Sequence, residues 1–216
     1  MNTFECPQEK LSSEKNAATS LMSLAGMAVL LIGLFASANS SQAANILANP
    51  GFETGDPTGW NKYGVFDFNT TNNFYYNNNN PTTHVWIYDG RFSGKTYGQF
   101  TGADDYDGEY QDVAVAAGSV LSADCWVYTS SQDHIGGANE AWIEVHFMDA
   151  ANTDLALYKS QVITTDPATL ALDAWIDFPV TNQVSPVIGT GSTMVAPAGT
   201  AKARYQIVFH QLCLDE

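Results

Sequence analysis

Residues 201–211, AKARYQIVFHQ, decide the fold of this chain, because apolar and polar residues alternate along most of the stretch. The apolar set is Ala203, Tyr205, Ile207 and Phe209. The polar set is Lys202, Arg204, Gln206 and His210. Successive side chains of a strand point to opposite faces, so this pattern predicts a strand with one face in a core and one polar face.

Two more stretches repeat the alternation. In residues 120–130 the core set is Leu121, Ala123, Cys125 and Val127, and the opposite set is Ser122, Asp124, Trp126 and Tyr128. In residues 141–149 the core set is Ile143, Val145 and Phe147, and the opposite set is Trp142, Glu144, His146 and Met148. Three predicted strands therefore have a polar face that also carries aromatic rings.

The chain from residue 45 onward contains many short strand patterns and no stretch of helical periodicity. The predicted strands are residues 95–101, 109–115, 120–129, 141–149, 156–164, 175–180 and 201–211. Clusters of Gly, Asn, Asp, Pro and Ser separate them, which predicts an all-β fold of two packed antiparallel sheets. The Asn-rich segment 69–83 is predicted to be a long surface loop.

Charge and composition exclude several classes of protein. The 216-residue chain has 8 Lys+Arg against 23 Asp+Glu, a net charge of -15. Binding to a phosphate backbone needs clustered basic residues, so we expect no nucleic-acid partner. With 45% hydrophobic and 12% aromatic residues the chain can bury a core, which excludes a disordered acidic tail and suits one domain.

Residues 1–44 are predicted to be a secretory signal peptide, and residues 45–216 the mature domain. The uncharged apolar run 21–35 has about 15 residues, whereas a bilayer span takes ~20, and Ser41 and Ala43 offer small side chains for cleavage. We expect cleavage after Ala43 or Ala44, no stable membrane span afterwards, and a secreted, cell-surface or periplasmic location. An uncleaved anchor is the alternative, because acidic neighbours offset the basic residues before the run.

The cysteines leave two alternatives open. Cys6 lies in the predicted signal peptide, so the mature domain keeps Cys125 and Cys213. Export allows a disulfide between them, but two independent thiols, with Cys125 as a small core residue, fit the sequence equally well. Neither cysteine has the CxxC spacing or histidine partners of a zinc site.

The outward aromatics Trp126, Tyr128 and Trp142 need an explanation, because leaving such rings in water is costly. One explanation is that loops such as the Asn-rich segment cover them. The other is a sugar platform, since pyranose rings stack on aromatic faces while their hydroxyls need hydrogen-bond partners. The candidate hydroxyl partners are Glu144, His146, Arg204, Gln206 and His210.

Several motifs in order resemble carbohydrate-binding modules with the galactose-binding-like fold. The first is Asn45–Gly55, NILANPGFETG, which resembles the opening strand of that family and runs into Gly59-Trp60. The others are RFSGK at residues 91–95, YQDVAVAAG at 110–118, SADCWV at 122–127, Trp175, and APAGT at 196–200 followed by residues 203–209. The resemblance covers most of the mature chain.

The resemblance implies a two-sheet antiparallel jelly-roll β-sandwich that binds polysaccharide and holds a structural calcium. In that family the glutamate of the opening motif and a carbonyl of the SGK turn bind the ion, which here implies Glu53 and the carbonyl of Lys95. A solvated carboxylate or a turn cap is the alternative role for Glu53. The family's closing strand, which completes the calcium site, has no counterpart in the last residues, 209–216, where Asp215 is the nearest substitute.

The acidic stretch 104–109, DDYDGE, does not match an EF-hand loop, because Ala103 and Ala114 stand where ligands are needed. We expect a solvated acidic turn there, with a cation site as the alternative. Asp124 and Glu144 could act as the two carboxyls of a glycosidase if their strands are neighbours, because glycoside cleavage requires a fixed carboxyl separation across the scissile bond. His146 and His210 could meet on one sheet face and bind a metal, but hydrogen-bonding roles are commoner for two such histidines.

Together these patterns predict a secreted, non-catalytic carbohydrate-binding module. Its expected partner is a polysaccharide or glycan, with other domains of a larger secreted protein as a further class of partner. The first alternative is a structural or adhesive cell-surface domain without sugar binding. The second is a small glycoside-cleaving enzyme.

Overall fold

The computed structural model describes residues 2–5, 44–70, 87–131, 134–166, 169, 171–185 and 193–212. All regular structure in these ranges is β, and every strand pair is antiparallel, so the predicted all-β class is confirmed. The strands are β1 (Asn2–Glu5), β2 (Asn61–Tyr63), β3 (Phe66–Thr70), β4 (Phe92–Thr96), β5 (Asp105–Ala114), β6 (Val120–Leu121), β7 (Trp126–Thr129), β8 (Glu140–Met148), β9 (Asp154–Ser160), β10 (Ile176–Asp177), β11 (Val180–Ser185), β12 (Met194–Val195) and β13 (Lys202–Gln211). Within these ranges no helix is long and apolar enough to cross a bilayer.

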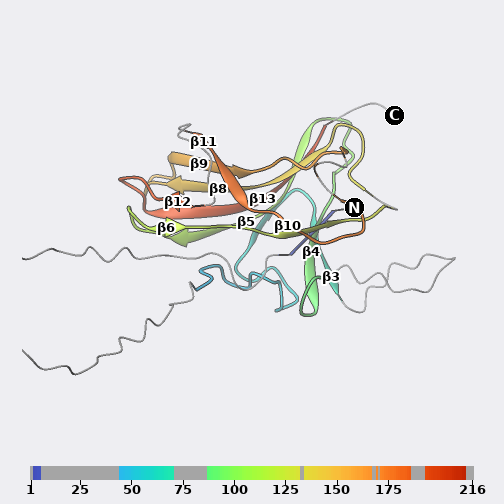
Figure 1. The fold of residues 1–216 in the computed structure, drawn as a ribbon, viewed down its shortest axis with the longest axis horizontal. Coiled ribbons are helices and arrows are strands. Elements are labelled where there is room, and N and C mark those ends of the chain that lie inside the picture. Colours follow the sequence, from blue (N-terminus) through green and yellow to red (C-terminus); the bar gives the residue numbers. More distant parts are fainter. Residues whose placement is uncertain are drawn as a thin grey trace, which may run out of the picture.

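The largest sheet has six strands in the order β11-β9-β8-β13-β5-β2. The strand predicted from residues 201–211 is β13, and it pairs along its whole length with β5, from Lys202 opposite Ala114 to Gln211 opposite Asp105. On its other side β13 pairs with β8. Figure 1 shows β11, β9, β8, β13 and β5 following one another across the molecule.

A five-stranded sheet has the order β10-β7-β1-β4-β3, and β12 pairs with β6 in a separate two-stranded sheet. In the five-stranded sheet β1 lies between β4 and β7 and pairs with both. The strand β1 comes from the segment predicted to be a signal peptide. Cleavage after Ala43 or Ala44 would therefore leave the β4 and β7 edges without the strand that joins them.

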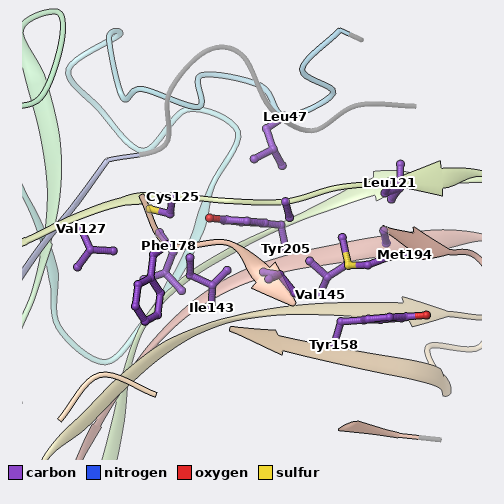
Figure 2. Close-up of a cluster of buried hydrophobic side chains, with 14 of the residues drawn as sticks. Leu47, Leu121, Cys125, Val127, Ile143, Val145, Tyr158, Phe178, Met194 and Tyr205 are labelled. Atoms are coloured by element: carbon purple, nitrogen blue, oxygen red, sulfur yellow. The ribbon is translucent and has the colours of Figure 1, made fainter. Parts of the chain in front are cut away.

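One hydrophobic core takes side chains from both larger sheets, including Val127 of β7, Ile143 and Val145 of β8, and Tyr205 of β13 (Figure 2). The predicted core sets of residues 120–130, 141–149 and 201–211 are all buried, so the alternation assigned their faces correctly. Cys125 is a buried thiol within this core, as one of the two alternatives predicted. Cys213 lies outside the described residues.

The opening motif is not a strand: residues 44–60 form turns and irregular structure. The Asn49 side chain holds this segment, since its amide donates to Thr54 Oγ1 at 2.6 Å and its Oδ1 accepts the Thr54 N–H at 3.1 Å. Phe52 and Trp60 are buried, with ring centroids 5.4 Å apart. The motif thus anchors a loop to the core through two aromatic rings.

Two other segments differ from the sequence-based expectation. Residues 120–129 are split into β6 and β7, because Cys125 and Ala123 form backbone hydrogen bonds with Phe178 and Val180 instead of continuing one strand. Residues 104–109 are not a solvated acidic turn, because β5 begins at Asp105 and both Asp107 and Glu109 are fully buried. The predicted Asn-rich loop lies almost entirely outside the described residues.

Candidate functional site

Six of the eight residues predicted to bind a glycan lie on the outward face of the six-stranded sheet. They are Trp142, Glu144 and His146 of β8, and Arg204, Gln206 and His210 of β13. Register places Gln206 opposite Glu144, and Arg204 opposite His146. We call this surface, with Tyr63, Tyr106, Tyr110 and Lys159, the polar sheet face. The remaining two, Trp126 and Tyr128, are on β7 of the other sheet, so the eight do not form one surface.

Glu144 is the centre of the hydrogen bonding on the polar sheet face. Trp142 Nε1 donates to Glu144 Oε1 at 2.6 Å, and His146 Nε2 lies 3.0 Å from Glu144 Oε2. The other ring nitrogen of His146 is 3.2 Å from the carboxylate of Asp154. Both oxygens of Glu144 therefore have partners within the protein.

The Glu144–His146 pair favours its charged form. Burial alone would raise the pKa of Glu144, but the hydrogen bonds from His146 and Trp142 outweigh it, so the pKa of Glu144 lies below 4.5. Burial alone would lower the pKa of His146, but Glu144 and Asp154 outweigh it, so the pKa of His146 lies above 6.5. Between these two values both groups are charged in the folded protein.

This pair predicts a specific pH dependence of stability. A raised histidine pKa stabilises the fold below the unfolded pKa of about 6.5, and this contribution is lost as the pH rises through the folded value. A lowered glutamate pKa stabilises the fold above about 4.5, and this is lost as the pH falls through the folded value. The stability difference between wild type and Glu144→Gln, from urea unfolding, should therefore be larger near pH 5.5 than near pH 8.5. An equal difference at both values would contradict the assignment.

Tyr63 crosses the polar sheet face from β2 to β13. Its hydroxyl donates to the carbonyl of Ile207 at 2.7 Å and accepts a hydrogen bond from Gln206 Nε2 at 3.1 Å. Tyr63 pairs with Gly108 of β5, and the missing side chain of Gly108 lets the phenol pass over that strand. Burial raises the pKa of Tyr63 above its ordinary value. Sequence reasoning missed this tyrosine, because Gly108, over which it passes, lies in the stretch predicted to be an acidic turn.

Two cations cover aromatic rings on the same face. Lys159 Nζ lies 3.4 Å from the centroid of Trp142, and the Arg204 guanidinium lies 3.9 Å from that of Tyr110. Burial lowers the pKa of Lys159. Trp142 is only 6% exposed, so it supports Lys159 and Glu144 rather than offering an open ring.

Tyr106 is the exposed aromatic ring of the polar sheet face. It is 53% exposed and stacks on His210 with centroids 4.2 Å apart and the rings 3° from parallel. Trp142 meets the same pair edge-on, at 6.5 Å from Tyr106 and 6.2 Å from His210. Sequence reasoning missed Tyr106 because it lies in the stretch predicted to be an acidic turn.

The aromatics on β7 are covered by other parts of the chain. Tyr88 stacks on Trp126 at 4.2 Å, and Trp175 packs against Tyr128 at 5.4 Å. The Tyr128 hydroxyl reaches Asp173 at 3.3 Å. The alternative in which loops cover outward aromatics therefore describes this sheet, where Tyr88 is 40% exposed.

The two residues predicted to bind calcium are Glu53, in the opening segment, and Lys95, in β4. Both oxygens of Glu53 accept the N–H of Arg91, at 2.9 and 3.0 Å, and Oε1 also accepts the N–H of Phe92 at 3.2 Å. Lys95 lies three residues further along β4, which is roughly 10 Å at strand spacing. Glu53 thus holds the turn before β4. Asp215 lies outside the described residues.

The candidate glycosidase pair, Asp124 and Glu144, and the candidate metal pair, His146 and His210, are not brought together by the fold. Asp124 precedes β7 and alternates with the buried Ala123 and Cys125, whereas Glu144 faces outward from the other sheet. The segment of Asp124 pairs with residues 178–180 and not with β8, so the two carboxylates do not lie on neighbouring strands. His210 pairs with Glu140, six residues from His146 along β8, which separates the histidines by roughly 20 Å.

No protein-family model matches this sequence, and no curated protein is significantly similar to it. The inference of function therefore depends on the geometry of the polar sheet face. That face combines one exposed ring, several rigid hydrogen-bonding groups and paired charges on a wide sheet.

Proposed function

We propose that this protein is a secreted, non-catalytic domain that binds polysaccharide on the polar sheet face. We further propose that its two larger sheets belong to a jelly-roll β-sandwich of the galactose-binding-like type. The observation that carries the binding proposal is Tyr106, a half-exposed ring held by stacking on His210. A ring fixed in this way can accept the flat C–H face of a pyranose without losing rotamer freedom on binding.

The polar neighbours of Tyr106 suit the hydroxyls of such a sugar. Glu140 lies opposite His210, with its carboxylate 3.9 Å from the histidine ring, and Gln206 lies further along β13. The hydrogen bond from Gln206 to the Tyr63 hydroxyl holds that amide in place, so little reorganisation of Gln206 opposes binding. We expect weak, extended recognition of a chain rather than burial of a single small sugar.

A structural or adhesive role without sugar binding is the second candidate. It is favoured because groups on the polar sheet face already have partners within the protein. Both oxygens of Glu144 accept hydrogen bonds, and Lys159 covers the ring of Trp142. Under this role the network stiffens a sheet and Tyr106 is an isolated exposed ring. The two candidates predict different behaviour of one variant.

Tyr106→Ala should abolish most of the retardation of the protein in native gels that contain a bound polysaccharide, because it removes the exposed ring. Xylan, mixed-linkage β-glucan, galactomannan and alginate serve as probes. The matched control is Tyr88→Ala, which removes a similarly exposed tyrosine from the segment that packs on β7 of the other sheet, and this variant should migrate like wild type. Loss of retardation in the control but not in Tyr106→Ala would move the site to β7.

A further inference from the structure

A pocket of about 320 Å³, here called the end pocket, lies where the loop after β4, the loop before β8 and the end of β13 meet. Its volume is at the small end of the range of small-molecule sites. Phe209 and Gln211 line it, and they alternate along β13 with His210. The end pocket is therefore on the opposite side of β13 from the polar sheet face.

Aromatic and aliphatic side chains form one part of the wall of the end pocket. Phe209 and Ile135 are buried, and Tyr97 and Phe100 add two further rings. None of the described residues that line the pocket is Asp, Glu, Lys or Arg. Such a wall favours an uncharged ligand with a flat apolar body, because a charged one would lose its hydration without gaining a partner.

Phe100 is held at the edge of the end pocket in an unusual state. Its ring is 78% exposed, and its backbone has a φ of 55°, which bulky side chains rarely adopt. Its N–H donates to Gln211 Oε1 at 3.0 Å, and Gly98 permits this contact, because a Cβ at that position would collide with the same oxygen. An exposed ring on a strained backbone beside a pocket points to a ligand.

Three uncharged polar side chains also line the end pocket. His134 Nδ1 lies 2.8 Å from the carbonyl of Ile135, so in the neutral ring it is the donor and Nε2 is the acceptor. Asn139 Oδ1 accepts the N–H of Leu212 at 3.0 Å, and Gln211 Oε1 also accepts a backbone N–H. The NH₂ end of both amides is then the part that can donate to a ligand.

We propose that the end pocket binds one small, neutral aromatic compound with a polar edge, such as a phenol that carries a carbonyl group. Its ring stacks on Phe100 and its other apolar atoms contact Phe209. Its carbonyl accepts from the side-chain amides, and its hydroxyl donates to His134 Nε2. A sugar suits this pocket less well, because hydroxyls surround its ring and some would face Phe209 and Ile135 without partners.

The test is equilibrium dialysis of the full chain at pH 7 against 4-hydroxyacetophenone, with methyl β-D-glucopyranoside as the sugar probe. Wild type should bind one molecule of the phenol and none of the sugar. Phe100→Ala should bind the phenol about 3- to 10-fold more weakly, the usual contribution of one aromatic contact. This variant should fold, because the ring that it removes is exposed.

Asn139→Asp tests the polar edge of the ligand separately. The carboxylate still accepts the N–H of Leu212 but replaces the NH₂ donor, so binding of the phenol should weaken by about 3- to 10-fold. The matched control is Tyr88→Ala, which removes an exposed ring outside the pocket and should bind the phenol like wild type.

Three results would overturn the proposal. The first is that folded wild type retains no 4-hydroxyacetophenone. The second is that the sugar probe binds instead and is lost in Phe100→Ala, which would identify a monosaccharide pocket. The third is that Phe100→Ala and Asn139→Asp both keep wild-type affinity for the phenol, which would place the compound elsewhere on the protein.

Discussion

Replacement of Phe147 by Ala is expected to lower the free energy of unfolding by about 3–5 kcal/mol, the usual cost of removing a buried phenyl ring. Phe147 is 0% exposed and lies on the core-facing side of β8. Its ring packs edge-on against Tyr158 of β9, with centroids 5.8 Å apart. Neighbouring strands fix both rings, so the cavity can collapse only in part. Urea unfolding followed by circular dichroism measures the loss.

Phe100→Ala is the matched control, because it removes the same ring from a position that is 78% exposed. We expect this control to change the free energy of unfolding by less than ~0.5 kcal/mol. Equal losses in the two variants would contradict the position of the core between the two larger sheets. A loss below about 1 kcal/mol for Phe147→Ala would contradict the packing of β8 on that core.

Gly108→Ala is expected to destabilise the protein by roughly 2–5 kcal/mol, or to prevent folding, through strain and crowding. Gly108 has a φ of 146°, which side chains rarely adopt, and an added methyl group would collide with the carbonyl of Ile207. The same methyl would lie 2.8 Å from the hydroxyl of Tyr63. It would therefore disturb the pairing of β5 with β13 and the hydrogen bond from Tyr63.

Gly118→Ala separates crowding from backbone strain in this experiment. Gly118 has a φ of 80°, but a methyl group there would have no atom within 4 Å. It should therefore lose only about 1–3 kcal/mol, the cost of strain. Equal losses at the two positions would show that the close approach of β5, β13 and Tyr63 is not a constraint.

Strand identity and strand faces were predictable where local alternation was regular. The core sets around Val127, Ile143 and Tyr205 are all buried, because a period of two residues fixes which side chains share a face. The bounds of β8 and β13 follow the predicted segments within one residue. For these strands, local pattern and tertiary packing favour the same arrangement.

The prediction failed where tertiary contacts override local pattern. Asp105–Glu109 has the composition of a turn, yet pairing with β13 makes it a strand. Asn45–Trp60 has an apolar opening typical of a strand, yet Asn49 and two buried rings hold it as a loop. Neither the pairing partner nor the ring contacts can be derived from the local sequence.

The sequence predicted which residues of the candidate site face outward, but not which of them lie together on one surface. Alternation identified Trp142, Glu144 and His146 as outward, and their register with β13 then brings Arg204 and Gln206 beside them. The same alternation also predicts that Trp126 of β7 faces outward, but β7 belongs to another sheet. Local alternation cannot show this, because sheet membership depends on pairing between distant strands. The exposure of a ring also depends on which side chains cover it, so Tyr106 is exposed whereas Trp142 is buried.

The measurement that tests the central claim most directly is native affinity electrophoresis of the wild-type protein. The gels contain xylan, mixed-linkage β-glucan, galactomannan or alginate, and a cooperative thermal transition first establishes that the protein is folded. We predict that one class of polysaccharide retards the protein, and that Tyr106→Ala restores its mobility. Uniform mobility of the folded wild-type protein in every gel would contradict glycan binding on the polar sheet face and favour the structural role.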